Sequence, residues 1–196
     1  MLKIGITGGI GSGKTTVCKI FELLDVPVYY ADDASKELLL HDPFIKSKIL
    51  TVFGEGVLGE DQFISRKKMA ERVFENEKEL NKLNEIMHPA VAKHFDNWLK
   101  KQEAFPYILK EAAIMFESNA YLQVDKVITV TAPVDIRVKR VMKRDGTKKE
   151  DILKRMNAQL SDEEKVKRSQ FVIVNDNQKL VIPQVLALHS VFKNGL

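Results

Sequence analysis

The 196-residue sequence contains one cysteine, no long apolar run and almost no excess of charge of either sign. Because Cys18 has no second cysteine to pair with, an internal disulfide is excluded and a reducing compartment is expected. No apolar run approaches the ~20 residues that span a bilayer. The chain does not open with a charged leader followed by an apolar stretch and a small-residue cleavage site. We therefore expect a cytoplasmic protein with no membrane partner.

Aromatic residues are also few, at 8%, and the net charge is only +4, from 31 Lys and Arg against 27 Asp and Glu. This excess is too small to indicate nucleic acid, and the basic stretches lack the interleaved aromatic residues that stack on bases. With 44% hydrophobic and 30% charged residues, the composition is that of a folded globular protein. We expect one domain, or one domain with a small insertion, and no nucleic-acid partner.

The first chemistry-bearing motif lies at the start of the chain, where residues 8–15 read GGIGSGKT. It fits G-x-x-x-x-G-K-[ST], the phosphate-binding loop, whose glycines allow positive φ angles so that backbone N–H groups surround a phosphate. An apolar strand pattern precedes it and a helical pattern follows, as the motif requires. Lys14 is expected to reach the β- and γ-phosphates of ATP, and the Thr15 hydroxyl to coordinate Mg²⁺. The candidate ATP-binding residues of this segment are Gly8, Gly9, Gly11, Ser12, Gly13, Lys14, Thr15 and Thr16.

Five short apolar segments, separated by helical patterns, predict an α/β fold of the P-loop NTPase type, with a parallel five-stranded sheet flanked by helices. In such a sheet the strand carboxyl ends share one edge, where ligands usually bind. The expected strands are residues 2–7, 27–30, 106–109, 126–131 and 171–174.

Two stretches are longer than the crossovers of such a sheet require. Residues 33–105 carry apolar residues at helical spacing and predict a helical substrate-binding insertion. Residues 134–168 are charged and helical and predict a lid. The nucleotide-binding core then comprises residues 1–32, 106–133 and 169–196, and the helices expected within the insertion are about 34–40, 66–74, 79–87 and 89–101.

Local signals predict where some of these helices begin and end. His88 precedes Pro89, and the residue before a proline avoids helical angles, so a helix boundary is expected there. Thr147 and Ser161 are each followed three residues later by Glu, the pattern of a capping box at a helix start.

Asp32 follows the second expected strand, on the same sheet edge as the phosphate-binding loop. A carboxylate there can accept the proton of an attacking hydroxyl, or hold that hydroxyl in line with the γ-phosphate. Alternatively, Asp32 or Asp33 caps the helix expected from about Ala34. The two roles can coexist, with one carboxylate capping and the other catalysing.

Arg137, Arg140 and Arg144 fall at i, i+3 and i+7, so they share one helical face just after the fourth expected strand. Guanidinium groups placed there can close over a triphosphate as a lid and stabilise the transferred charge. The alternative is a solvated basic face. Arg155 is a weaker candidate of the same kind.

Other polar residues give weaker signals. Glu111 follows the third expected strand and either holds a Mg²⁺-bound water or has a surface or capping role. Arg66 either meets an anionic substrate or is solvated surface. His88 and His94 do not share a helical face, so we expect no metal site made of protein ligands. Cys18 is expected to be a small core residue.

Taken together, these residues resemble the dephospho-CoA kinase family over nearly the whole chain. The opening segment TGGIGSGKT is similar to that family's loop, and Asp32 matches the second acid of its Asp-Ala-Asp motif, the one usually assigned as base. Two positions depart from the pattern: Tyr30 replaces the first acid of that motif, and Ala113 replaces a proline. The other matches, in order, are Arg66, Met87-His88-Pro89, Phe116-Glu117, Arg140 with Arg144-Asp145, Arg155, Gln159 and residues 171–175.

The resemblance implies transfer of the γ-phosphoryl group of ATP to the 3′-hydroxyl of the ribose of dephospho-CoA, the last step of coenzyme A synthesis. It implies ATP and Mg²⁺ as cofactors and dephospho-CoA as the small-molecule partner of a monomer or weak homo-oligomer. The implied catalytic residues are Asp32, Lys14 and Arg140; Arg140 and Arg144 would close the lid on ATP, and Asp32, Arg66 and His88 would bind the substrate.

Two other functions stay open at this level, because a phosphate-binding loop does not by itself name a reaction. Another P-loop small-molecule kinase, acting on a nucleoside or nucleotide, would share the loop, the carboxylate and the arginine lid, and only the insertion discriminates against it. A P-loop ATPase or switch acting on a macromolecule would show partner-stimulated hydrolysis and no small acceptor.

Overall fold

The computed structural model describes residues 1–73 and 76–195, which fold into two compact units. The sheet unit consists of Met1–Tyr30 and the chain from Lys100 onward, and the helical unit is Ala31–Leu99. Position 74 of the helix expected over 66–74, and position 196 of the expected core, lie outside the described residues.

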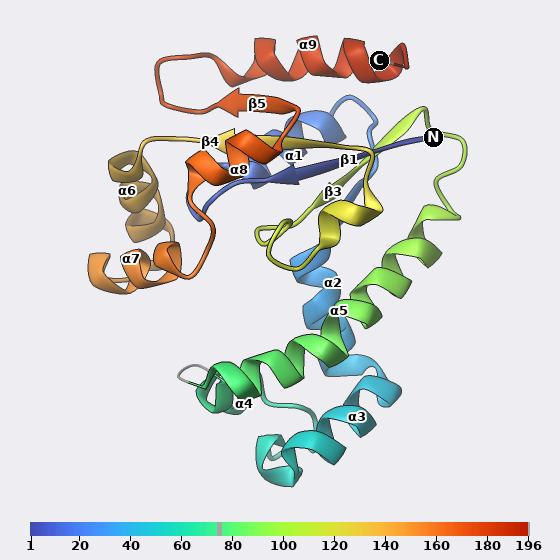
Figure 1. The fold of residues 1–196 in the computed structure, drawn as a ribbon, viewed down its shortest axis with the longest axis vertical. Helices are drawn as coiled ribbons and strands as arrows, with labels where there is room; N and C mark the ends of the chain where they lie inside the picture. The colour runs from blue at the N-terminus through green and yellow to red at the C-terminus, as the bar shows by residue number, and fades with distance from the viewer. Residues whose placement is uncertain (74–75, 196) are drawn as a thin grey trace. The chain divides into compact units, whose positions relative to one another are not determined.

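The sheet unit is built on five parallel strands in the order β2-β3-β1-β4-β5 (Figure 1). This confirms the predicted α/β fold. The third strand ends later than expected, so it includes Glu111. The strands are β1 Leu2–Thr7, β2 Val28–Tyr30, β3 Tyr107–Glu111, β4 Lys126–Thr131 and β5 Phe171–Val174.

The sheet is covered on both faces, as a parallel sheet requires. On one face, α1 (Lys14–Glu22) and α9 (Val181–Lys193) pack on β1 and β4 in one apolar core. On the other face, the Thr129 hydroxyl of β4 donates to the carbonyl oxygen of Lys165 in α8 (Asp162–Arg168), at 3.3 Å. Figure 1 shows α8 in front of the sheet and α1 behind it.

Helix α1 begins directly after the glycine-rich loop. Its buried residues are Val17, Cys18 and Phe21, and Ile20 and Leu24 are partly buried against the same core. Cys18 is the expected core residue, and burial raises the pKa of its thiol. We therefore expect it to be a poor nucleophile.

Helices α6 (Val134–Asp145) and α7 (Lys149–Asn157) follow β4 and share a small apolar core. The capping box at Ser161 is confirmed, because its side chain accepts a hydrogen bond from the Glu164 N–H at 3.2 Å. The capping box at Thr147 is wrong. Helix α7 begins at Lys149, so Lys148 takes the N-cap position, and its side chain makes no capping hydrogen bond.

The helical unit has an apolar core of its own, to which each of its four α-helices contributes. The second of these helices was not predicted. It is capped by Asp42, whose side chain accepts hydrogen bonds from the N–H groups of Phe44 and Ile45, and Pro43 occupies its first turn. The helices are α2 Ala31–His41, α3 Pro43–Phe53, α4 Arg66–Val73 and α5 Glu77–Leu99, with a short 3₁₀ helix, η1 Glu55–Val57, after α3.

Helix α5 continues through Pro89, so the boundary expected at His88-Pro89 is wrong. Pro89 has no N–H, so the carbonyl group of Glu85 receives no helical hydrogen bond from it. Residues on both sides of the proline, including Met87 and Ala90, nevertheless pack in the core of the helical unit. This packing outweighs the local preference.

Helix α2 begins at Ala31, earlier than expected, because β2 passes into it without a loop. Asp32 and Asp33 therefore lie in its first turn, and the hypothesis that one of them is the N-cap of a helix from Ala34 is wrong. A carboxylate in a first turn is still favoured by the helix dipole. Asp33 forms an exposed ion pair with Lys36 at 2.6 Å.

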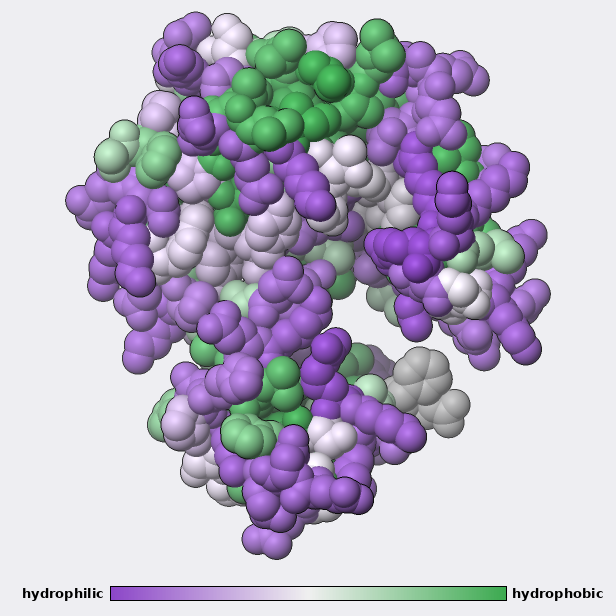
Figure 2. Space-filling model, turned by 180° about the vertical axis from the view of Figure 1, so that it is seen from behind, coloured by the Kyte–Doolittle hydropathy of each residue, from purple (hydrophilic) through white to green (hydrophobic). Residues whose placement is uncertain are grey.

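Helix α9 carries apolar residues on its outer face as well as its inner face. Its inner residues Val185 and Phe192 are buried in the main core. Figure 2 shows apolar side chains gathered over this helix, and its exposed apolar residues are Ile182, Leu186 and Val191. Among the described residues, no helix has the length and apolar character needed to cross a membrane.

Candidate active site

The loop between β1 and α1 has the backbone that phosphate binding requires. Gly8, Gly11 and Gly13 have φ angles of +148°, +80° and +98°, as the motif predicted. The first helical hydrogen bond runs from the Val17 N–H to the Gly13 carbonyl oxygen, at 3.1 Å. The N–H groups that begin the helix therefore point out of its N-terminus, toward the position where an anion binds.

The Ser12 side chain is fully buried within this loop. Its hydroxyl oxygen has no hydrogen-bond partner among the described residues. Buried polar groups normally have a partner, so an orphaned hydroxyl inside the loop fits a site that is completed by a ligand.

Lys14 lies folded over the loop. Its Nζ donates a hydrogen bond of 2.9 Å to the Gly8 carbonyl oxygen and lies 3.9 Å from Glu111 Oε1. Only 11% of the Lys14 side chain and 8% of the Glu111 side chain are exposed. The surface role considered for Glu111 is therefore wrong, because this carboxylate is buried at the end of β3 beside the loop lysine.

Arg140 of α6 lies against the same loop. Its guanidinium donates to the carbonyl oxygen of Ser12 at 3.4 Å, to the carbonyl and side-chain oxygens of Asn175 at 3.0 and 3.1 Å, and to Asn177 Oδ1 at 2.6 Å. Asn175 also donates from Nδ2 to the Ser12 carbonyl oxygen, at 2.8 Å. The structure thus places a cation beside the loop and fixes its orientation.

Arg144 shares α6 with Arg140 but is not held at the loop. Its side chain is 63% exposed and forms a bidentate pair with Asp145, with N–O distances of 2.7 and 2.9 Å. Arg155, on α7, is also exposed. Arg137 differs from both. It is buried and ion-paired with Asp162, so the hypothesis that it belongs to a mobile lid face is wrong.

The remaining candidates belong to the helical unit. Asp32 is exposed, two residues after the end of β2, and Arg66 is the exposed first residue of α4. His88 is half-buried in α5, and burial lowers the pKa of its imidazole, which favours the neutral, hydrogen-bonding form over the charged one. The roles of Asp32, Arg66 and His88 at a bound substrate stay predictions.

Sequence reasoning assigned no role to three residues near the loop: Asn175 and Gln159, which form hydrogen bonds with it, and Asp162, which pairs with Arg137. Asn175 directly follows β5, so the strand-end argument applied to Asp32 would have found it. Gln159 lies shortly before α8, and Asp162 is the first residue of that helix. Nothing in the local sequence pattern distinguishes either of them from ordinary surface residues.

Comparison with known proteins agrees with this geometry. The sequence model described as dephospho-CoA kinase matches residues 2–180. The chain is 40% identical over 187 residues to a dephospho-CoA kinase of Bacteroides fragilis, which covers 95% of this chain and 91% of that protein.

Two solved structures are similar to the whole fold. TT1252 from Thermus thermophilus superposes with a TM-score of 0.85 at 31% identity and covers 100% of this chain and 98% of its own. A dephospho-CoA kinase from Campylobacter jejuni gives a TM-score of 0.71 at 28% identity and covers 98% of each chain. The extent of these matches, together with the loop geometry, shows that the chain belongs to the dephospho-CoA kinase family.

Proposed function

We propose that this chain transfers the γ-phosphoryl group of ATP to the 3′-hydroxyl of the ribose of dephospho-CoA, giving coenzyme A and ADP. The observation that carries the proposal is the convergence of Lys14 and Arg140 on a loop with three positive-φ glycines, in a chain of this family. Two cations and a row of backbone N–H groups are the parts that phosphoryl transfer needs, because its catalysis depends on positioning and on charge stabilisation.

The residue roles follow from the chemistry of each group. The backbone of residues 8–16 and the Lys14 ammonium would bind the phosphates, and Arg140 would stabilise the charge on the transferred group. Asp32 would orient the acceptor hydroxyl or take its proton. Arg144 would join the lid of residues 134–168 once it leaves Asp145, and the lid would exclude water from the reaction.

In this proposal the helical insertion of residues 33–105 binds the pantetheine-bearing substrate, with Arg66 and His88 among its contacts. An exposed guanidinium suits the phosphate groups of such a substrate, and a neutral imidazole suits a hydroxyl or amide. A monomer or weak homo-oligomer acting in the cytoplasm fits this reaction.

The donor set at the loop fits Mg²⁺. Thr15 is exposed and offers a hydroxyl oxygen, and Glu111 offers a carboxylate. Within residues 1–73 and 76–195, no three His, Cys, Asp or Glu side chains come together as a metal-sized group. Mg²⁺ commonly binds through one or two protein oxygens plus substrate phosphates, so this sparse set is appropriate. Mg²⁺ there would neutralise phosphate charge.

Glu111 is predicted to couple Mg²⁺ to nucleotide binding. The Lys14 ammonium lies 3.9 Å from the buried Glu111 carboxylate. If bound phosphates draw the ammonium away, a hydrated Mg²⁺ can take its place as the cation beside Glu111. Glu111→Gln should therefore lower the factor by which Mg²⁺ strengthens ADP binding, by about 10-fold. Calorimetric titration of ADP, with Mg²⁺ and with a chelator, measures that factor.

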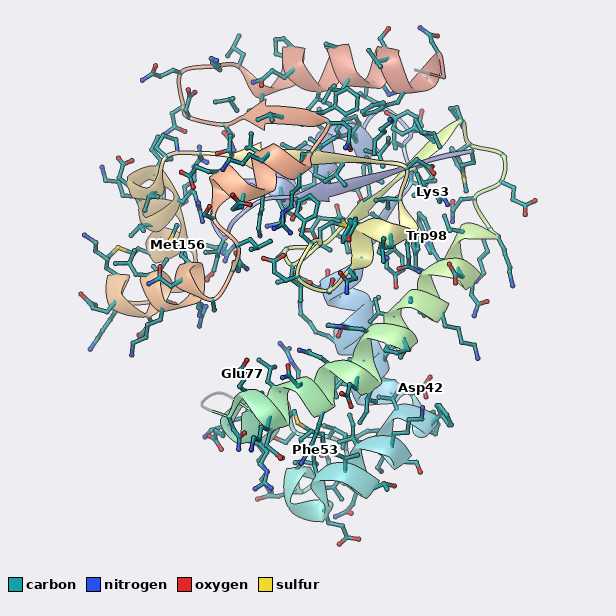
Figure 3. All side chains as sticks on the ribbon, in the orientation of Figure 1. Lys3, Asp42, Phe53, Glu77, Trp98 and Met156 are labelled. Atoms are coloured by element: carbon teal, nitrogen blue, oxygen red, sulfur yellow. The ribbon has the colours of Figure 1, made fainter. Side chains whose placement is uncertain are left out.

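Asp125→Asn is the matched control, because it removes the same charge at the other end of β1. Asp125 pairs there with Lys3, which Figure 3 labels. The control should keep the wild-type dependence on Mg²⁺. An unchanged dependence in Glu111→Gln would contradict the role given to this carboxylate.

The proposed function is tested by ADP release with Mg-ATP and four acceptor conditions: dephospho-CoA, nucleosides, nucleoside monophosphates and no acceptor. We expect a large stimulation by dephospho-CoA alone, with coenzyme A formed in equal amount. Stimulation by a nucleoside instead would show that the protein is a kinase whose substrate is not dephospho-CoA. Turnover that ignores every acceptor would indicate an ATPase.

A further inference from the structure

The apex of the phosphate-binding loop, Ile10, is held by two side chains from distant parts of the chain. Its carbonyl oxygen accepts a hydrogen bond of 2.9 Å from Arg137 Nε in α6. Its N–H donates to Gln159 Oε1, in the segment between α7 and α8, at 3.3 Å. Both peptide groups of the apex are therefore fixed by the region that follows β4.

Arg137 is itself fixed by Asp162, the first residue of α8. Arg137 Nη1 lies 2.8 Å from Asp162 Oδ2, and these side chains are only 6% and 14% exposed. The same Asp162 oxygen accepts a hydrogen bond of 3.2 Å from the Thr131 hydroxyl. In so shielded a pair, removal of one partner leaves the other charge uncompensated, so the geometry is strongly maintained.

The ion pair lies directly on the backbone of the loop at Gly9. A Cβ added to Gly9 would overlap the Arg137 guanidinium and lie 2.8 Å from Asp162 Oδ1. In this backbone conformation Gly9 therefore has no space for a side chain. The backbone conformation of Gly9 and Ile10 and the position of the ion pair depend on each other.

A cavity of about 830 Å³ that Arg137 helps to line does not resemble a phosphate site. Met156 of α7, labelled in Figure 3, contributes to the same lining. That lining includes Asp162, whose charge is already paired with Arg137, and two further acids, Glu163 and Asp176, whose charge repels a triphosphate. Arg137 is thus directed at the protein's own loop.

We propose that Arg137 and Asp162 form a clamp that sets the shape of the phosphate-binding loop, which makes Arg137 a positioning residue for the nucleotide and not a lid arginine. Two donor groups of its guanidinium are committed, Nε to Ile10 and Nη1 to Asp162. A loop held in its binding conformation loses less entropy when phosphates bind, so the clamp acts on nucleotide affinity. This inference rests on the proposed nucleotide site.

Two conservative variants separate loop positioning from simple stabilisation. Arg137→Lys keeps a charge for Asp162 but loses the planar fork that also reaches Ile10. It should weaken ADP binding by about 10- to 100-fold, the range for one charged hydrogen bond, and raise KM for ATP more than it lowers kcat. Asp162→Asn keeps the bond from Arg137 to Ile10 but removes the anion that fixes the guanidinium, so it should lower the melting temperature and weaken ADP binding by less than Arg137→Lys does.

The measurements are ADP titration, thermal melting and steady-state kinetics on the full chain. Arg168→Lys, on an exposed arginine of α8 paired with Glu164, is the matched control and should bind ADP like the wild type. The inference is overturned if Arg137→Lys also binds ADP like the wild type, or if both variants lose affinity in proportion to melting temperature. A wild-type protein that binds ADP but does not phosphorylate dephospho-CoA would overturn the proposed function and leave the clamp in place.

Discussion

Replacement of Asp32 by asparagine is expected to lower turnover by about 10²-fold or more, while ATP affinity stays near the wild-type value. Asp32 follows the edge strand β2 by two residues and is exposed in the first turn of α2. Asparagine keeps the shape and the position in the turn but cannot take a proton from the acceptor hydroxyl. Turnover with dephospho-CoA, and titration with ATP in the absence of an acceptor, check the two halves of this prediction.

Asp33→Asn is the natural control for this variant. Asp33 is an exposed acid in the same helical turn, and it is already engaged with Lys36. Its replacement should change turnover by less than about 3-fold, as is usual for surface positions. Near-normal turnover in Asp32→Asn, or an equal loss in both variants, would remove the catalytic role from Asp32.

Arg140→Ala is expected to lower phosphoryl transfer by about 10³-fold, the lower range for an arginine that stabilises the transferred phosphoryl group. The structure adds a second, smaller consequence. The guanidinium also connects Ser12, Asn175 and Asn177, so its loss should lower the free energy of unfolding by about 1–3 kcal/mol. Single-turnover rates and denaturant unfolding separate the two effects.

Asn177→Ala provides the comparison for Arg140. It removes the 2.6 Å hydrogen bond to the guanidinium but leaves the cation beside the loop. We expect Asn177→Ala to lower the free energy of unfolding by part of the amount lost in Arg140→Ala, and to change the rate of phosphoryl transfer only slightly. If Asn177→Ala slows phosphoryl transfer as strongly as Arg140→Ala, then Arg140 acts by bracing the loop and not on the transferred charge.

The sheet and the loop were predictable because each is encoded locally. A run such as Lys126–Thr131 indicates a buried strand by composition alone, and its predicted bounds match β4. The glycine, lysine and threonine spacing of residues 8–15 determines one backbone shape, which the φ angles of Gly8, Gly11 and Gly13 confirm. The strand-end rule then placed Glu111 correctly on the edge where Lys14 lies.

The features that were missed depend on contacts between distant residues. The core of the helical unit includes Met87 and Ala90, on both sides of Pro89, and the helix continues although the local signal favours a break. Arg137 and Arg140 share a helix and look equivalent in sequence. Only the fold shows that Arg137 meets Asp162 while Arg140 meets Asn175.

The strand order has a consequence for how the protein is made. Strand β1 is synthesised before the other strands of the sheet, yet Leu2 pairs with Tyr107, and Ile4 pairs with Lys126 on the other side. Strand β1, which leads into the phosphate-binding loop, therefore has no pairing partner until β3 and β4 have been synthesised. The helical unit, in contrast, is one continuous segment with its own core. Nascent chains that end before β4 should contain helices but retain no nucleotide.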